Sequence, residues 1–261
     1  MIRVGVIGAG GRMGSEVCRA VDEADDLDLV AAVDPSEAGR SLADVAAVAG
    51  DVEVSGDLDA LTAASVEVAV DFTHPDAVAG NVRWLLDNGV HAVVGTTGMT
   101  DDDLVDLRER AATSDANALL APNFAIGAVL LMQFAAQAAE HLPHVEVIEL
   151  HHDRKAEAPS GTALRTAELI ADARHETPPH VGGDDAHPGA RGTRHHDVTV
   201  HSVRLPGLVA HQEVIFGGLG QTLTIRHDSL DRTSFMPGVL LAVRSVADLD
   251  EPLVVGLEHV L

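Results

Sequence analysis

Short apolar runs alternate with segments of helical spacing along the first part of the chain. The apolar run at residues 2–7 ends in glycines and is typical of a buried strand, and residues 12–24 then have the spacing of a helix. Strands that alternate with helices are typical of βαβ units, so a Rossmann-type α/β fold with a parallel sheet is expected. The same pattern predicts strands at 28–34, 66–72, 90–94 and 116–120, and helices at 76–88 and 100–114.

The pattern changes after Pro122. Residues 126–140 have the composition of a long apolar helix, and residues 145–150 alternate as a half-buried strand. A last helix at 234–246 resembles the first half of the chain again. Between them, strand patterns follow one another without helices, which is typical of a mostly antiparallel sheet in an α+β domain. These strands are expected at 198–203, 213–216 and 222–227.

The two patterns predict two domains. A dinucleotide-binding domain would comprise residues 1–122 and 233–261, and an inserted α+β substrate domain would comprise residues 123–232. Within the insertion, residues 175–196 are rich in Pro, Gly, His and Asp. This stretch is longer than most loops in compact domains, which suggests a function for it.

Composition and charge restrict the class of protein. Hydrophobic residues make up 46% of the 261 residues, which excludes a disordered chain and supplies material for a core. The formal net charge of −24 repels phosphate backbones, so nucleic acid is not an expected partner. Because the acidic residues are spread along the whole chain, they indicate either general solubility or a halophilic protein of a high-salt cytoplasm, and we favour the second.

The chain carries no sign of export or of membrane insertion. It begins directly in a strand pattern, and none of its apolar runs approaches the roughly 18 residues that span a bilayer. Its single cysteine, Cys18, cannot form an internal disulfide bond. A cytoplasmic protein without a membrane partner is therefore expected.

A glycine-rich turn follows the first predicted strand and begins the first predicted helix. Glycines let the backbone approach a pyrophosphate, and the helix N-terminus supplies free N–H groups. The spacing departs from G-x-G-x-x-G, but Asp34 ends the second strand 20 residues after Gly14, where it can bind ribose hydroxyls. An ordinary glycine turn would not need that carboxylate. The residues expected to bind the dinucleotide here are Gly8, Ala9, Gly10, Gly11, Arg12, Met13 and Asp34.

Asp34 also bears on which nicotinamide cofactor is preferred. Its charge would repel a 2′-phosphate, and the next residues, Pro35 and Ser36, offer no cation to bind one. NADH is therefore expected to be preferred to NADPH, although Arg12 or Arg40 could reach a 2′-phosphate.

Two further turns follow strands of the same predicted sheet. Ligands of parallel sheets bind outside the carboxyl ends of the strands, so both turns are expected to line the cofactor crevice near the nicotinamide. The segment Phe72–Pro75 ends another strand and is expected to contribute. The alternative is that these are only sharp turns of small residues. The expected cofactor-binding residues are Gly95, Thr96 and Thr97 in the first turn, and Ala121, Pro122, Asn123 and Phe124 in the second.

Groups that can bind anions and donate protons follow the strand at 145–150. His151 and His152 leave its end, and Lys155 follows them as the only lysine among the 17 basic residues. A helix pattern then starts near Ser160, Gly161 and Thr162, where backbone N–H groups favour a carboxylate or phosphate. This combination suits an anionic substrate that must receive a proton.

The histidine pair has two other interpretations. In a chain with 15 histidines, a pair is not rare and could be structural or exposed. Paired histidines can also bind zinc, but the chain has no H-E-x-x-H motif and Cys18 lies far away in the first helix. No metal site is therefore expected.

Four segments of the chain, taken together, carry a family resemblance. They are the glycine-rich turn at 8–14, Gly95–Gly98, Ala121–Phe124 and the pattern Glu-x-His-His-x-x-Lys-x-x-Ala-Pro-Ser-Gly-Thr-Ala at 149–163, which is the most specific. The combination resembles the 4-hydroxy-tetrahydrodipicolinate reductase family. The similarity extends from residue 4 to about residue 240 and includes residues 204–207 and 211–216.

The resemblance implies an NAD(P)H-dependent oxidoreductase of lysine biosynthesis. In this family a hydride reaches C4 of a cyclic imine dicarboxylate as water is lost, and the adjacent carbon is protonated. His151 would be the general acid, and Lys155 would assist protonation and pair with a substrate carboxylate. The family also implies a homotetramer formed through the substrate domain. The residues that would hold the substrate carboxylates are His152, Ser160, Gly161 and Thr162.

The sequence departs from many relatives at two places. It lacks a basic residue after Asp34, which puts the use of NADPH in doubt, and it has Ala156-Glu157 where a residue followed by Asp is usual. Two rival functions fit the sequence less well than the reductase. An aldehyde-oxidising dehydrogenase needs a cysteine nucleophile, but Cys18 lies in the cofactor helix. A non-catalytic NAD-binding regulator would not need His151 and Lys155.

Overall fold

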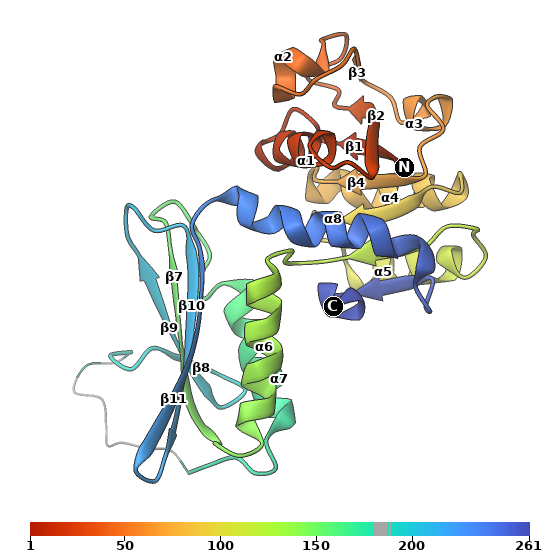
Figure 1. The fold of residues 1–261 in the computed structure, drawn as a ribbon. Helices are drawn as coiled ribbons and strands as arrows, with labels where there is room; N and C mark the ends of the chain where they lie inside the picture. Colours follow the sequence, from red (N-terminus) through yellow and green to blue (C-terminus); the bar gives the residue numbers. More distant parts are fainter. Residues whose placement is uncertain (180–186, 188) are drawn as a thin grey trace. The chain divides into compact units, whose positions relative to one another are not determined.

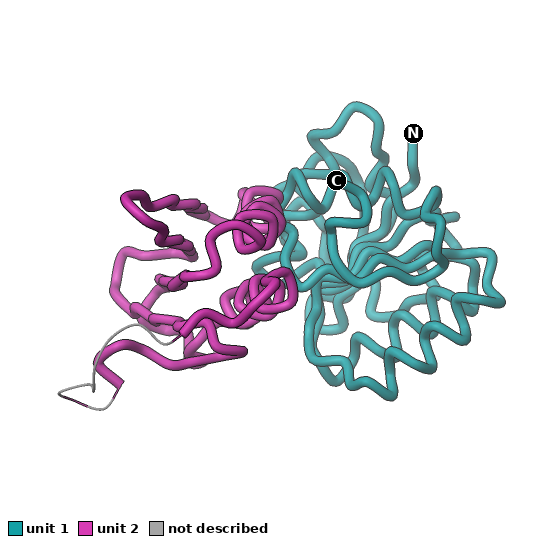
Figure 2. Tube along the Cα trace, turned by 90° about the horizontal axis from the view of Figure 1, so that it is seen from below, with its two compact units in different colours: residues 1–124, 235–261 teal, residues 125–234 magenta. Residues whose placement is uncertain are grey.

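The computed structural model describes residues 1–179, 187 and 189–261, which form two compact units (Figure 2). Unit 1 comprises Met1–Phe124 and Phe235–Leu261, and unit 2 comprises Ala125–Ser234. The boundary predicted after residue 122 placed Phe124 in the inserted domain. Phe124 instead belongs to unit 1, because its buried ring packs against Phe72 with the ring centroids 5.8 Å apart.

Unit 1 is built on a parallel sheet with helices between its strands (Figure 1). The strands are β1 (Ile2–Ile7), β2 (Leu27–Val33), β3 (Val54–Ser55), β4 (Val68–Asp71), β5 (His91–Val94), β6 (Ala118–Leu120) and β12 (Leu253–Val255). The helices are α1 (Arg12–Asp22), α2 (Leu42–Ala46), α3 (Asp59–Ala63), α4 (Pro75–Asp87), α5 (Asp101–Ala111) and α8 (Met236–Ser245). The strand order is β12-β6-β5-β4-β1-β2-β3, which confirms the predicted Rossmann-type sheet. The short elements α2, β3, α3 and β12 were not predicted.

The sheet of unit 1 is buried on both faces, which explains why its strands are apolar runs. Ala69 and Val94 lie on one face, in a core that includes side chains of α4 and α5. Val68 and Val70 point to the opposite face and are equally buried, because successive side chains of a strand alternate. A strand that is buried on both sides has no polar positions in its interior, so it shows no alternation in the sequence.

Unit 2 combines two helices with a mixed sheet. The helices are α6 (Ile126–Ala139) and α7 (Gly161–Ala173), and the strands are β7 (His144–His151), β8 (Thr193–His195), β9 (Val198–Arg204), β10 (Ala210–Gly218) and β11 (Gln221–Ser229). The order is β11-β10-β7-β9-β8, with β7 and β9 parallel and the other neighbours antiparallel. The predicted, mostly antiparallel α+β unit is confirmed. β8 was predicted as part of the loop at 175–196, of which residues 180–186 and 188 lie outside the described residues.

The helices α6 and α7 cover one face of the sheet of unit 2 (Figure 1). Val147, Val214 and Phe216 point toward these helices and form a core with Leu131 and Ile170. By the alternation of β7, Glu149 lies on the same face as Val147. Neither α6 nor any other helix within the described residues is long and apolar enough to cross a membrane.

Candidate functional site

The glycine-rich turn between β1 and α1 can accommodate the phosphates of a dinucleotide. At Gly8 and Gly14, neighbouring backbone atoms lie where a Cβ would stand. Gly8 has a φ of 82°, and a Cβ on Gly14 would lie only 1.9 Å from the carbonyl oxygen of Gly8. Glycine is therefore required at both positions. No side chain of the described residues caps α1, and its first turn holds no acidic residue. The N–H groups of this helix end can bind an anion.

Asp34 lies beside this turn, at the end of β2, as the sequence predicts for a ribose ligand. Its carboxylate accepts hydrogen bonds from the Gly10 N–H at 3.0 Å and from the Ser36 hydroxyl at 2.6 Å. A second carboxylate, which the sequence pattern did not reveal, lies close by: the Cγ of Glu37 is 2.5 Å from where a Cβ on Gly10 would stand. Arg40, a candidate ligand for a 2′-phosphate, is paired with Glu37. Two acidic side chains therefore border the glycine turn.

Asp71, a residue not predicted to belong to the site, holds the loops after β4 and β5 together. Its side chain is fully buried at the end of β4. One carboxylate oxygen accepts hydrogen bonds from the hydroxyls of Thr73 at 2.7 Å and of Thr96 at 2.8 Å, and the other accepts from the Asn81 amide at 2.7 Å. In the sequence, Asp71 could have been recognised as a site residue because it is a carboxylate at the end of an otherwise apolar strand.

The two turns predicted to line the cofactor crevice border one small cavity. It has a volume of about 130 Å³ and is lined by Thr96 and Thr97 after β5 and by Ala121 and Pro122 after β6. Packing alone requires glycine at position 95, because a Cβ there would lie 2.1 Å from the Phe72 ring. The turns are thus brought together at the carboxyl ends of the strands, where ligands of parallel sheets bind.

In unit 2, a buried carboxylate fixes the predicted general acid. Glu149 is fully buried, and its Oε2 is hydrogen-bonded to Nδ1 of His151. Arg204 binds both oxygens of the same carboxylate, at 2.9 and 2.8 Å. The bidentate pair holds Glu149 in place, and Glu149 in turn orients the imidazole ring. Both residues lie in segments that carry the family resemblance, but the sequence assigned no role to Glu149 or to Arg204.

The charge of Glu149 is maintained by its partners. Burial disfavours the charged form, but hydrogen bonds from His151, Arg204 and Ser202 outweigh it and lower the pKa of Glu149 from 4.5 to about 2. The carboxylate is therefore ionised at neutral pH. It accepts a hydrogen bond from the Nδ1–H of His151, which leaves Nε2 as the ring nitrogen that can act on a substrate.

His152 and Lys155 lie in the loop that follows β7. The Nδ1 atom of His152 is buried and has no hydrogen-bond partner among the described residues, as expected for a group that binds a ligand. The ammonium of Lys155 is 3.4 Å from the carboxylate of Glu157, whose side chain is 78% exposed. Such an exposed pair is weak, so the ammonium can exchange this partner for a substrate carboxylate. Arg204 shapes the loop by donating to the carbonyl oxygen of Lys155 at 3.3 Å.

The predicted anion cradle is the N-terminus of α7. The buried hydroxyl of Ser160 accepts a hydrogen bond from the Ala163 N–H at 3.2 Å and caps the helix. Ser160 therefore also has a structural task as the N-cap of α7. Gly161 is exposed, and a Cβ there would meet no atom within 4 Å. Packing does not require glycine at this position, but its missing side chain leaves the first turn of the helix accessible, with Thr162 next to it.

The chain matches family models along almost its whole length. The model described as "Dihydrodipicolinate reductase, N-terminus" matches residues 2–124, and the one described as "Dihydrodipicolinate reductase, C-terminus" matches residues 127–261. The 4-hydroxy-tetrahydrodipicolinate reductase of Mycolicibacterium vanbaalenii is 54% identical, covering 100% of this chain and 99% of the relative. That of Halalkalibacterium halodurans is 49% identical, with 100% of both chains covered.

Two solved structures are similar to this chain. The dipicolinate-bound dihydrodipicolinate reductase from Paenisporosarcina sp. TG-14 superimposes with a TM-score of 0.89 at 42% identity, covering 100% of both chains. An amine dehydrogenase from Mycobacterium smegmatis has a TM-score of 0.70 at 16% identity, which shows a common fold alone. The resemblance found in the sequence is confirmed: this chain belongs to the dihydrodipicolinate reductase family.

Proposed function

We propose that this protein is a 4-hydroxy-tetrahydrodipicolinate reductase. It would reduce a cyclic imine dicarboxylate to tetrahydrodipicolinate, with loss of water, in the synthesis of lysine through diaminopimelate. Family membership supports this function for the whole chain. The observation that carries it is the geometry of unit 2: buried Glu149 orients His151, and the chain then continues through a loop with Lys155 to the accessible start of α7.

The residues of unit 1 described above would hold the nicotinamide cofactor. The turn at Gly8–Met13 would receive the pyrophosphate, Asp34 the adenosine ribose, and the loops at 95–97 and 121–124 would border the nicotinamide. When bound, a reduced nicotinamide supplies a hydride. The close approach of Gly8 to Gly14 and the helix end without a capping side chain among the described residues fit this group.

The residues of unit 2 would bind the substrate and supply the proton. With both ring nitrogens protonated, His151 would donate the Nε2 proton to the carbon adjacent to C4, while its Nδ1–H stays hydrogen-bonded to Glu149. Lys155 would pair with one substrate carboxylate and assist this protonation. The N–H groups of Gly161 and Thr162 at the start of α7, together with His152, would hold a carboxylate.

An assay of cofactor oxidation tests this function. Pyruvate and aspartate semialdehyde are condensed immediately before the protein and NADH are added, and NADH absorbance is followed at low and at molar KCl. We expect substrate-dependent oxidation, and we expect it to be faster at molar KCl because salt screens the repulsion within a chain of net charge −24. A chain that binds NADH but oxidises none at either salt concentration would be a non-catalytic regulator.

We expect kcat/KM to be roughly tenfold higher with NADH than with NADPH, a difference of about 1.4 kcal/mol. The carboxylates of Asp34 and Glu37 beside the glycine turn would repel a 2′-phosphate, and Arg40 is already paired with Glu37. Glu37→Gln should lower the ratio of kcat/KM with NADH to kcat/KM with NADPH, because it removes one negative charge and releases Arg40. Glu23→Gln, at the other end of α1, is the matched control. A tenfold preference for NADPH in the parent protein contradicts the proposal.

A homotetramer formed through unit 2 is expected in solution. The helices cover one face of its sheet, and the other face presents Ile148 and Ile215, which are only half-buried. Apolar side chains on an uncovered sheet face are typical of an interface. Light scattering at molar KCl should give about four times the protomer mass, and Ile215→Arg should lower it. A monomer under all conditions would contradict this expectation.

A further inference from the structure

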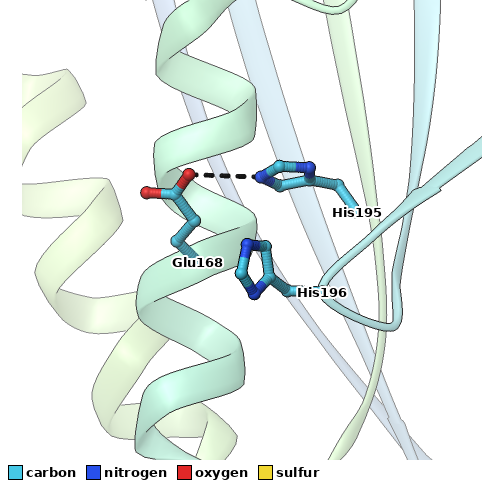
Figure 3. Close-up of side chains that lie close together, drawn as sticks. All are labelled: Glu168, His195 and His196. Carbon is cyan, nitrogen blue, oxygen red and sulfur yellow. Dashed lines mark hydrogen bonds and ion pairs between the residues drawn. The ribbon is translucent and has the colours of Figure 1, made fainter.

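Three potential metal ligands meet in unit 2 at a place that the proposed reaction does not use (Figure 3). Glu168 lies on α7, His195 is the last residue of β8, and His196 follows it. One ligand atom of each residue lies within 4.8 Å of those of the other two. Glu168 is seven residues along α7 from Gly161, which corresponds to about 10 Å along the helix axis. The group is therefore separate from the proposed substrate-binding end of the helix.

The turn between β8 and β9 brings the two histidines to the same side. His195 pairs with Val198, so the turn has only two residues, His196 and Asp197, whose φ angles are 47° and 61°. Two left-handed residues make a turn that favours Asn-Gly, and a bulkier residue is strained there. Neighbours along a regular strand point to opposite faces, but here the two imidazole centroids are 4.5 Å apart. The hairpin thus holds a histidine in an unfavourable conformation next to a second one.

The distance between the His195 and Glu168 ligand atoms suits a tetrahedral ion. Nε2 of His195 is 3.2 Å from Oε1 of Glu168. Two ligands of a tetrahedral zinc ion with bonds of roughly 2.0–2.1 Å lie about 3.3 Å apart, so this pair needs almost no rearrangement. His196 is exposed, and its ring can rotate toward the pair. Figure 3 shows both rings on the side of α7 from which the Glu168 carboxylate projects.

The surrounding charges leave the position accessible to a cation. Arg165 contacts the other carboxylate oxygen of Glu168, Oε2, at 3.3 Å, and its own side chain is largely exposed. Arg194 is paired with Asp197 at 2.9 Å, which offsets its charge. The side chains of His195 and Glu168 are about one-third exposed, so an ion and a water ligand can reach them from solvent. The net charge of −24 favours the approach of cations.

We propose that Glu168, His195 and His196 bind a zinc ion, with water as the fourth ligand. Two imidazole nitrogens and one carboxylate oxygen are a set that zinc prefers. The ion would connect the β8–β9 hairpin to α7 and so stabilise unit 2. Any ion that binds only the folded chain raises the free energy of unfolding.

Zinc binding to the untagged, full-length protein tests this proposal. The protein is treated with a chelator, and zinc is titrated in competition with a chromophoric chelator, in the absence of substrate and cofactor. We expect one more tight zinc ion per protomer in the parent protein than in Glu168→Gln or His196→Ala. We also expect zinc to raise the melting temperature of the parent by several degrees and to leave that of the two variants unchanged.

His141→Ala is the matched control, because it removes an exposed histidine of the same unit outside the group. It should bind zinc and gain melting temperature like the parent, which separates the proposed site from weak binding by other histidines. Equal turnover of all variants without zinc shows that they are folded. The same zinc stoichiometry and the same thermal shift in Glu168→Gln, His196→Ala and the parent would overturn the proposal.

Discussion

Replacing either His151 or Lys155 with alanine is expected to lower kcat by roughly 10²-fold or more, the usual contribution of a positioned proton donor. His151 Nδ1 is bound to the buried carboxylate of Glu149, which presents Nε2 for proton transfer. Among the described residues, the one side-chain partner of Lys155 is the exposed Glu157, so its ammonium can serve the substrate. Steady-state kinetics with NADH, together with the melting temperature of each variant, measure the effect.

Two further variants separate the roles. Lys155→Arg keeps the positive charge but cannot give up a proton near neutral pH, so we expect a KM closer to that of the parent and a kcat that stays low. His201→Ala is the control for His151, because His201 is also paired with a glutamate of β7, Glu146, at 2.8 Å. Its turnover should remain close to that of the parent. Near-normal turnover in both His151→Ala and Lys155→Ala would refute the assignment.

Replacing Glu149 with glutamine is expected to lower both activity and stability. The amide can donate a hydrogen bond to Nδ1 of His151, which favours the wrong tautomer, so we expect kcat to fall roughly 10²-fold while KM changes little. The change also leaves the partly buried Arg204 without its charged partner. Breaking a buried ion pair costs roughly 3–5 kcal/mol, which should lower the midpoint of urea unfolding.

The same carboxylate predicts a pH dependence of the parent protein. Because the pKa of Glu149 is lowered from 4.5 to about 2 on folding, its contribution to stability is fully present above pH 4.5. It is lost as the pH falls from 4.5 toward 2, where the unfolded chain binds a proton that the folded chain does not. Urea unfolding at several pH values should therefore show a smaller loss of stability over this range in Glu149→Gln than in the parent.

Glu146→Gln is the matched control for Glu149→Gln. Glu146 lies on β7 as well, but on the opposite face, where it is paired with Arg191 at 2.6 Å and with His201. The control therefore removes a charge pair from the same strand without touching His151. We expect its kcat to stay near that of the parent. If Glu149→Gln and Glu146→Gln have the same kcat and the same pH profile, Glu149 does not position the proton donor.

Features that depend on neighbouring residues could be read from the sequence. The strand β1, the glycine turn and the helix α1 follow one another within 22 residues, and each is specified by its own local pattern. The motif at 149–163 is continuous, so His151, Lys155 and the start of α7 could be recognised together. Short elements such as β3 and β12 could not be predicted, because two or three residues show no periodicity.

Features that depend on distant residues could not be read in this way. Asp71 and Thr96 are 25 residues apart, and Glu149 and Arg204 are 55 residues apart. Their meeting is set by the order of the strands and by the register of β7 against β9, which aligns His151 with Arg204. Glu168 and His195 are likewise 27 residues apart, which is why the spacing of histidines alone indicated no metal site.

The sequence by itself determined the two fold classes, the cofactor turn, the reactive segment and the family, because each is encoded in local periodicity or in a continuous motif. The tertiary structure alone decided which buried carboxylates hold these residues in place. Asp71, Glu149 and Arg204 act through partners that only strand pairing brings within hydrogen-bond distance. A buried charge is tolerated only where such partners converge, and that convergence is a property of the folded chain.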